Sequence, residues 1–359
     1  MLDLPKCSFT RVVVLTIGLC CLNHVGCSTQ KGPEQGSSVE SFTEKAADAA
    51  KQDRSTVSAG TAAEAGTSVS SQSVAVANQA AQSTGRPAVA QPLSVARLQK
   101  LLKEKNPTYA GDGVFHKAGG EIIVADLSFR PIRDLSPLKG LPLERLDLRG
   151  TRVEDLTPLK GMPLRELYLE STNVSDLSPL KGAPLRVLYL NGTPVKDISP
   201  LSDAPLFMLN LTNTQVSDLS PVRKMPLNTL WVGKSNVRDI SVLAGKHLES
   251  LDVQYTAVSD LKPLAGMISL QRLNIVGSQV TDLTPLAGLH LTRLLFTPSR
   301  IRKGLDVVRN MTSLRQLDVE FRQPRMLTPA EFWQKFDAGE FNTSSSEETK
   351  TQPTPNKEE

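Results

Sequence analysis

Leucine recurs along the middle of the chain in the spacing Leu-x-x-Leu-x-Leu, each time followed by a polar turn. The motif begins at Leu143 and returns every 21 residues as far as Leu248, and three further copies follow at steps of 22, 21 and 23 residues. A weaker copy starts at Ile122. A fixed period of this length predicts a solenoid of about ten stacked units.

Within a unit, the motif predicts a short strand followed by a turn and a second apolar position. Side chains alternate between the two faces of a strand, so the fourth and sixth residues of the motif point into the core. The recurring segment Asp-Leu-Ser-Pro-Leu-Lys-Gly then predicts a short helical turn with Ser or Thr as its N-cap and Pro at the first helical position. The second apolar column comprises Val153, Val174, Val195, Val216, Val237, Val258, Val280 and Ile301.

Two columns of polar residues accompany the apolar ones. We expect the hydroxyl column to bond backbone groups of the turn. We expect the carboxylates to accept from turn amides or to face solvent, and no single unit clusters the ligands that calcium needs. The hydroxyl column is Thr151, Thr172, Thr193, Thr214, Ser235, Thr256, Ser278 and Ser299. The carboxylate column is Asp134, Asp155, Asp176, Asp197, Asp218, Asp239, Asp260 and Asp282.

One unit cannot fold alone, because its few buried side chains do not offset the entropy of ordering the backbone. Stability therefore belongs to the array, predicted over 122–322, and its ends require caps. An apolar stripe of Leu98, Leu101 and Leu102 predicts a helical N-terminal cap within 94–121. The pair Thr328 and Glu331 forms a capping box for a C-terminal helical cap within 323–341, anchored by Phe332, Trp333 and Phe336.

The N-terminus has the pattern of a secretory signal. An apolar run from Val12 to Leu22 follows two basic residues and ends in small residues before Cys27, and it is too short for a spanning helix. The ending His-Val-Gly-Cys resembles a bacterial lipoprotein signal, which implies lipid modification of Cys27. Ordinary cleavage nearby and an uncleaved anchor stay open. We expect 1–27 to be a lipoprotein-like signal peptide.

Two further segments lack the apolar residues that a core requires. Residues 28–93 are rich in Ser, Ala, Thr and Gln and predict a disordered tether, and 342–359 predict a disordered tail. All four cysteines lie within the first 27 residues, so we expect no disulfide framework or thiolate metal site in the folded part.

The repeat, written LxxLxLxxTxVxDLSPLKG, resembles the bacterial leucine-rich repeats of the internalin type over roughly residues 95–340. It is also similar to short repeats of bacterial secreted proteins and of some receptor-like serine/threonine kinases. The resemblance implies an α/β solenoid: a leucine-rich repeat horseshoe with a parallel sheet on the concave face, short helical turns on the convex face and helical caps. It leaves the function open, because this architecture serves binding to very different partners.

The third and fifth residues of each motif are expected to face outward from the concave surface, where they are free to differ between units. Tyr168, Tyr189 and Trp231 fall in the fifth column within four adjacent units, next to apolar third-column residues and flanked by charge. An aromatic centre with a polar rim is typical of binding hot spots. The alternative, that these rings only cover neighbouring backbone, stays open. The predicted partner-binding residues are Glu166, Tyr168, Val187, Tyr189, Met208, Asn210 and Trp231.

The remaining composition argues against other classes of function. A net charge of +4 is too small to favour nucleic acid. The sequence shows no phosphate loop, Gly-x-Ser-x-Gly or His-Glu-x-x-His motif, so we expect neither catalysis, cofactor nor metal and see no small-molecule substrate. We predict an exported, non-catalytic binding module on the cell envelope, anchored to the membrane by lipid, that recognises a protein or glycan. The alternative is a structural surface spacer or self-associating envelope component without a discrete ligand.

Overall fold

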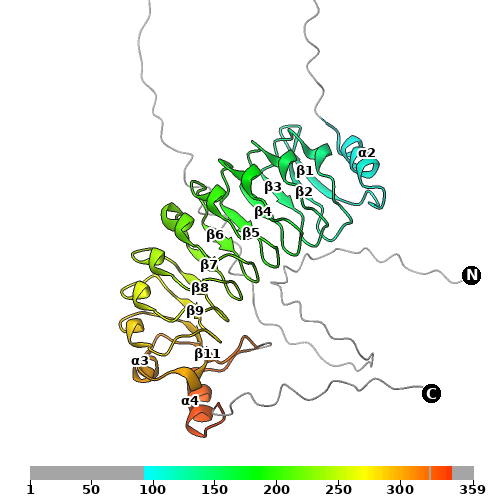
Figure 1. Ribbon diagram of the computed structural model, residues 1–359. Coiled ribbons are helices and arrows are strands. Elements are labelled where there is room, and N and C mark those ends of the chain that lie inside the picture. Colours follow the sequence, from blue (N-terminus) through cyan, green and yellow to red (C-terminus); the bar gives the residue numbers. More distant parts are fainter. Residues whose placement is uncertain (1–92, 323–324, 342–359) are drawn as a thin grey trace, which may run out of the picture. The chain divides into compact units, whose positions relative to one another are not determined.

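The computed structural model describes residues 93–322 and 325–341. The predicted signal peptide, nearly all of the predicted tether and the predicted tail lie outside these residues. Within the described part, the repeats stack into a curved array whose strands line the inner face (Figure 1).

The strands form one eleven-stranded sheet in which spatial order follows chain order. Strands β2 to β11 are parallel with equivalent residues paired, as in Tyr168 beside Tyr189, whereas β1 is antiparallel to β2. Each repeat therefore contributes one short strand at the same register. The strands are β1 Val114–Ala118, β2 Glu121–Asp126, β3 Arg145–Asp147, β4 Glu166–Tyr168, β5 Val187–Tyr189, β6 Met208–Asn210, β7 Thr229–Trp231, β8 Ser250–Asp252, β9 Arg272–Asn274, β10 Arg293–Leu295 and β11 Gln316–Asp318.

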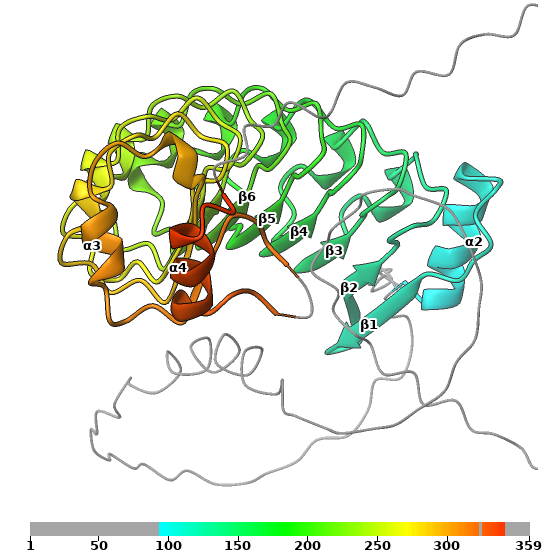
Figure 2. The same ribbon diagram turned by 90° about the horizontal axis from the view of Figure 1, so that it is seen from below.

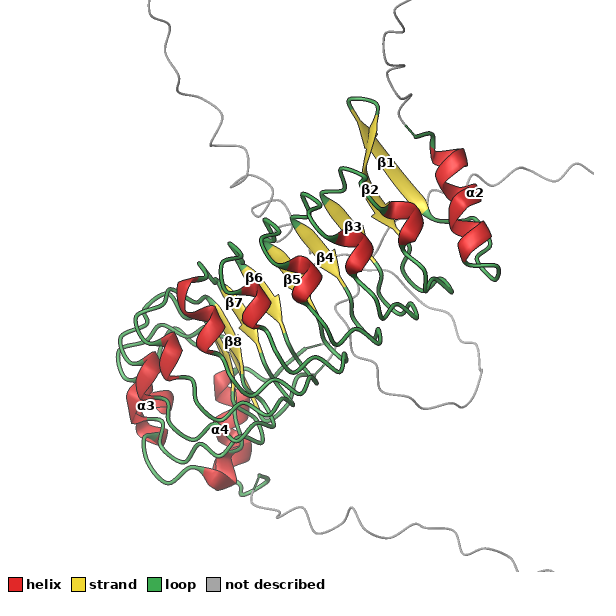
Figure 3. Ribbon diagram, turned by 45° about the horizontal axis from the view of Figure 1, so that its top comes forward, coloured by secondary structure: helices red, strands yellow, loops and turns green. Residues whose placement is uncertain are grey.

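Short 3-10 helices occupy the outer side of the array, opposite the sheet (Figure 3), except for the last one, Pro298–Arg300, which directly follows β10. In the unit that begins with β10 the α-helix α3, Leu305–Arg309, takes their place, which the repeat pattern did not predict. The 3-10 helices are η1 Ser136–Leu138, η2 Thr157–Leu159, η3 Ser178–Leu180, η4 Ser199–Leu201, η5 Ser220–Lys224, η6 Ser241–Leu243, η7 Lys262–Leu264, η8 Thr284–Leu286 and η9 Pro298–Arg300.

The predicted N-caps of these turns were wrong. Each Ser or Thr that was predicted as a cap is instead the first residue of its turn, and the cap position is an apolar residue without a side-chain bond. The aspartate two residues earlier accepts the free amide instead: Ser178 N donates to Asp176 Oδ1 at 2.8 Å, and the Ser178 hydroxyl donates to the second carboxylate oxygen at 2.8 Å. These donors lower the pKa of Asp176. The whole aspartate column makes the same amide bond, at 2.7–2.8 Å.

The core between sheet and turns is a continuous column of leucines. All three Leu positions of the motif are buried, for example Leu143, Leu146 and Leu148, and so are the valines of the second column. The hydroxyl column bonds the turn as predicted, with Thr151 Oγ1 donating to Leu148 O at 2.7 Å and the same bond in six further units. Ser299 is the exception, because it is exposed within η9.

Helices lie at both ends of the array (Figure 2). At the start, α2, Val95–Lys105, buries Leu98 and Leu102. At the end, α4, Pro329–Asp337, begins with the predicted capping box of Thr328 and Glu331. Strand β1 was not predicted, because its residues are mostly exposed and show no apolar alternation. No helix within 93–322 and 325–341 is long and apolar enough to cross a bilayer.

Candidate partner-binding site

The fifth residue of the motif ends each strand on the concave face, and in half of the units it holds the following turn. Asp147 Oδ1 accepts the amide of Arg149 at 3.1 Å, and Asn210 Oδ1 accepts the amide of Thr212 at 3.0 Å. This is a local turn in which a short polar side chain bonds the backbone two residues on. The same bond is made by Asp126, Asp252 and Asn274.

These five fifth-position residues therefore have a structural role in the turn that the pattern did not predict. Asn210 is buried, and its amide nitrogen donates to Asn191 Oδ1 at 3.1 Å while its oxygen holds the turn. Strand alternation places such a side chain on the concave face, but it does not reveal that the neighbouring turn already engages it.

Three fifth-position residues break this rule, because they are aromatic and cannot hold the turn. The rings of Tyr168 and Tyr189 stack with centroids 5.3 Å apart and planes at 24°. Tyr189 meets Trp231 edge to face, with centroids 6.3 Å apart and planes at 79°. All three side chains are half-buried. Parallel pairing in register thus brings three residues that span 63 positions of the sequence into one aromatic row.

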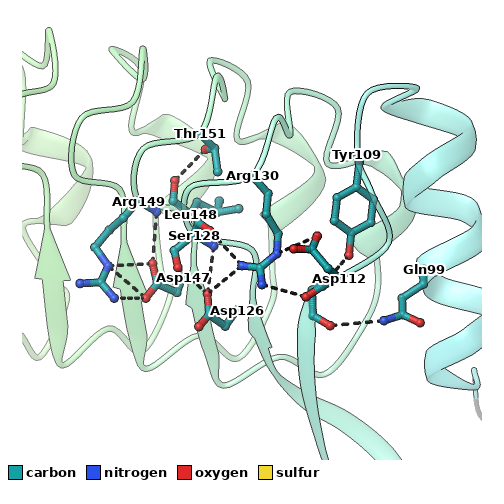
Figure 4. Close-up of polar contacts among 11 residues, drawn as sticks. Gln99, Tyr109, Asp112, Asp126, Ser128, Arg130, Asp147, Leu148, Arg149 and Thr151 are labelled. Atoms are coloured by element: carbon teal, nitrogen blue, oxygen red, sulfur yellow. Dashed lines mark hydrogen bonds and ion pairs between the residues drawn. The ribbon is translucent and has the colours of Figure 1, made fainter. Parts of the chain in front are cut away.

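Charged side chains close the N-terminal side of this row. The guanidinium carbons of Arg145 and Arg149 lie 5.1 and 5.6 Å from the centre of the Tyr168 ring. Glu166 accepts the Tyr168 hydroxyl at 3.1 Å and lies 3.5 Å from Arg145. Figure 4 shows Arg149 held against the carboxylate of Asp147, at 2.6 Å for the shortest contact. One face of the Tyr168 ring is therefore covered by cations and the other by Tyr189.

The other polar atoms of the aromatic row also have partners within the array. The Tyr189 hydroxyl lies 2.8 Å from the sulfur of Met208, and Trp231 Nε1 donates to Ser250 Oγ at 3.2 Å. The surface that these side chains present to the concave space is therefore mainly the edges of the aromatic rings and aliphatic carbon atoms. We call the predicted set the aromatic patch, and the structure places its members on the adjacent strands β4 to β7: Glu166, Tyr168, Val187, Tyr189, Met208, Asn210 and Trp231.

A buried carboxylate beside the patch was missed by sequence reasoning. Glu170 lies two residues past Tyr168, and its Oε2 is buried without a hydrogen-bond partner among the described residues. Burial raises the pKa of Glu170 to about 7, against the opposing effect of Arg149. The motif offers no signal for this residue, because it follows the strand at a position that is polar in most units.

A second carboxylate with a shifted pKa lies on the far side of the patch. Burial raises the pKa of Asp252 to about 6, although the amides of Gln254 and Asn274 donate to it. No three His, Cys, Asp or Glu side chains in 93–322 and 325–341 are grouped as ligands of a metal ion.

The C-terminal end of the concave face is covered by the chain itself. After β11 the backbone turns back, so that Leu317 N donates to Leu327 O at 3.1 Å and Leu327 N donates to Asp318 Oδ2 at 3.1 Å. Met326 is buried there in a small apolar cluster with Val276 and Leu295. Leu295 occupies the same motif position as Tyr189 but is only 2% exposed.

Two solved structures of Listeria monocytogenes proteins are similar to this array. One is an internalin with 26% sequence identity and a TM-score of 0.52, covering 65% of this chain and 79% of that one. The other is internalin C2, with 24% identity and a TM-score of 0.50, covering 58% of this chain and 99% of that one. A scan against protein-family models finds no match, and a search of curated proteins finds no relative.

Proposed function

Because the chain carries an internalin-type leucine-rich repeat array, we propose that its concave face is a recognition surface and that the aromatic patch binds a protein partner. One observation carries the proposal. Three of four neighbouring units replace the turn-holding Asp or Asn by an aromatic residue, although the turn geometry is maintained without it. These rings are not required by the repeat, so a role outside the fold accounts best for them.

The stacking of the rings favours a protein over a glycan. A sugar packs on the open face of an aromatic ring, but the Tyr168 ring lies between Tyr189 and two guanidinium groups. Ring edges and the Met208 side chain form an apolar strip of adaptable shape, which suits the side chains of a protein. A charged rim of Arg145, Glu166 and Asp252 surrounds that strip and supplies orientation.

The size of the patch agrees with a hot spot rather than a complete interface. Four parallel strands spaced about 4.8 Å apart span about 14 Å between the outermost strands. Buried Tyr and Trp side chains at interface centres each contribute about 2 kcal/mol or more when truncated. Their half-buried state in the free protein leaves apolar surface for the partner to cover.

The test is a cross-linked pull-down from the native envelope with the wild-type chain and a variant carrying Tyr168→Asn, Tyr189→Asn and Trp231→Asn. Asn is chosen because other units carry Asp or Asn there, so the variant retains the turns. The matched control is Lys139→Ala, Lys160→Ala and Lys181→Ala, three exposed residues of the outer turns. We expect one protein to be captured by wild type and control and lost by the aromatic variant. Equal capture by all three chains would favour a structural spacer.

We also propose that the chain is exported and held at the cell envelope through lipid on Cys27. The apolar run and the Val-Gly-Cys ending support this proposal, and the Ser- and Ala-rich residues 28–93 would place the array away from the membrane. Replacement Cys27→Ala should move the protein from the detergent phase to the aqueous phase in phase partition. Retention in the detergent phase would argue for an uncleaved anchor.

A further inference from the structure

A groove lies away from the aromatic patch, on the flank of the array where the strands begin. It is an open groove of about 530 Å³ between η5, η6 and the residues that precede β6 and β7. This volume falls in the about 300–1,000 Å³ range of ligand sites. Its walls are Phe207, Arg223, Lys224, Met225, Pro226, Leu227, Asn228, Val242, Ala244, Gly245, Lys246 and His247.

Four of these residues depart from what the other units carry at the same position. Lys224 replaces the Gly that six other units use to end the outer turn, and here the turn continues to five residues in η5. Lys246 replaces a Met, Ala or Leu, and His247 replaces the Pro of five units. Phe207 stands where neighbouring units have Glu, Arg or Asn, and it is 48% exposed. These departures from the repeat lie in adjacent units around one groove, where they add positive charge and an exposed aromatic ring.

One cation of the groove, Lys246, is held in a fixed position. Lys246 Nζ donates to the backbone carbonyls of Arg223 at 2.9 Å and Met225 at 3.0 Å, so its ammonium group is fixed against the wall of the groove. Burial and the nearby Arg223 lower the pKa of Lys246. Arg223 thus places a second positive charge near this lysine.

No carboxylate within the groove balances the positive charges of Arg223, Lys224 and Lys246. None of its wall residues is Asp or Glu, and Arg223, Lys224 and Lys246 form no ion pair with any of the described residues. Some other cations of this flank are paired, as Arg165 is with Glu144 at 3.7 Å. The groove thus gathers three cations that have no carboxylate partner among the described residues.

We propose that this groove binds an acidic peptide segment of a partner protein, in which carboxylates alternate with apolar side chains. The three cations would meet the carboxylates, and Phe207 with Val242 would receive the apolar side chain. The apolar wall favours a peptide over a polymer that carries only repeated anionic groups. This site is separate from the aromatic patch and can be tested without it.

The test is fluorescence anisotropy of a short labelled peptide that alternates Glu with Leu, titrated with the full chain at low salt. Matched peptides carry Gln in place of Glu or Ser in place of Leu. The groove variant is Lys224→Gly with Lys246→Met, which restores residues that other units carry and so protects folding. Control variants are Lys160→Ala with Lys181→Ala, and the aromatic-patch variant with three Asn substitutions. Heparin and phosphatidylglycerol vesicles serve as polyanion probes.

We expect the Glu-Leu peptide to bind, both matched peptides to bind more weakly, and the groove variant to lose about tenfold or more in affinity, since each lost charge pair weakens binding. Both control variants should bind as wild type does, including the aromatic-patch variant, which separates this site from the proposed function. Unchanged affinity of the folded groove variant would overturn the proposal. Binding of heparin or vesicles, but not of the Glu-Leu peptide, would assign the groove to a polyanion and overturn it equally.

Discussion

Two stretches of the same concave face treat apolar side chains in opposite ways. Over β10 and β11, Leu295 is covered by Met326 from the returning chain. Over β4 to β7, Tyr168, Tyr189 and Trp231 occupy the same motif position and stay half-buried, contacting one another but covered by no other described segment. The comparison shows that the fold can cover an apolar concave residue with its own chain, and that it leaves the aromatic patch open.

Hydrogen bonds to the returning chain explain why Leu295 is covered. Asp318, in the last unit, uses one carboxylate oxygen for the Val319 amide and the other for the Leu327 amide, which holds the returning chain over the sheet. Among the described residues, no segment makes such a return over the aromatic patch.

The largest expected effect is on stability at the covered end. Leu295→Ala should lower the free energy of unfolding by about 3 kcal/mol, because it leaves a cavity beneath Met326. Tyr189→Ala, at the equivalent open position, should cost only about 1 kcal/mol, since this side chain is only partly buried and its removal leaves no closed cavity. Urea unfolding of both variants measures the contrast. Equal losses would mean that the two stretches do not differ as described.

The next effect concerns pH and the buried Glu170. Burial raises its pKa from 4.5 to about 7, so the ionised form is disfavoured in the folded state. Its contribution to stability is complete below about pH 4.5 and is lost as pH rises through 7. Wild type should therefore lose about 2 kcal/mol of unfolding free energy between about pH 5 and 8. Glu170→Gln should remove most of that decline.

Two other carboxylates with shifted pKa values can be distinguished from Glu170 in this measurement. Asp252, with its pKa raised by burial to about 6, contributes a smaller decline of the same sign that Glu170→Gln leaves in place. The exposed Asp176 has a lowered pKa, so Asp176→Asn acts only in acid and should not alter the slope above about pH 5. A slope that Glu170→Gln leaves unchanged would show that this carboxyl is not held in a low-dielectric environment.

The repeating part of the molecule was predictable from sequence because its contacts are local and repeated. The leucine columns, the valine column and the bond from Thr151 to Leu148 follow from period and residue type alone. The cap assignment failed because a turn of three residues begins at the Ser, which places the aspartate two residues earlier in reach of its amide. The spacing of residues does not reveal whether a short turn is a 3-10 or an α-helix, and it does not fix the first residue of the turn to within one position.

The candidate site was predictable only in part. The in-register column brought Tyr168, Tyr189 and Trp231 together as the spacing implied, while their role in binding stays a prediction. The engagement of Asn210, the burial of Glu170 and the cover over Leu295 were not predicted. Each depends on a contact outside the motif, either in the adjoining turn or in a chain segment that returns from the end of the array.

A smaller effect should separate the polar fifth positions from the aromatic ones. Asn210→Ala removes the acceptor for the Thr212 amide and leaves Asn191 without its donor, at a cost of about 1 kcal/mol. Thermal unfolding monitored by circular dichroism measures it, with Asn173→Ala on the exposed flank as control. A cost no larger than that of the control would remove the structural role assigned to this column.

The smallest effect should come from converting an open position into the turn-holding kind. Tyr189→Asn loses part of the ring packing but gains a bond to the amide of Asn191, so the net change should be about 0.5 kcal/mol. Urea unfolding beside Tyr189→Ala tests the gain, because Asn should be the more stable of the two substitutions. If Asn were the less stable, the aromatic ring would have a structural task that the turn bond cannot replace.

The central claim is that the open aromatic patch serves recognition and not the fold. The most direct measurement is the dissociation constant of the captured partner for wild type and for the Tyr168→Asn, Tyr189→Asn, Trp231→Asn variant, with the unfolding free energy of each. We expect the variant to bind about 100-fold more weakly or worse, while its unfolding free energy changes by no more than about 2 kcal/mol. An unchanged dissociation constant, with the variant folded, would contradict it.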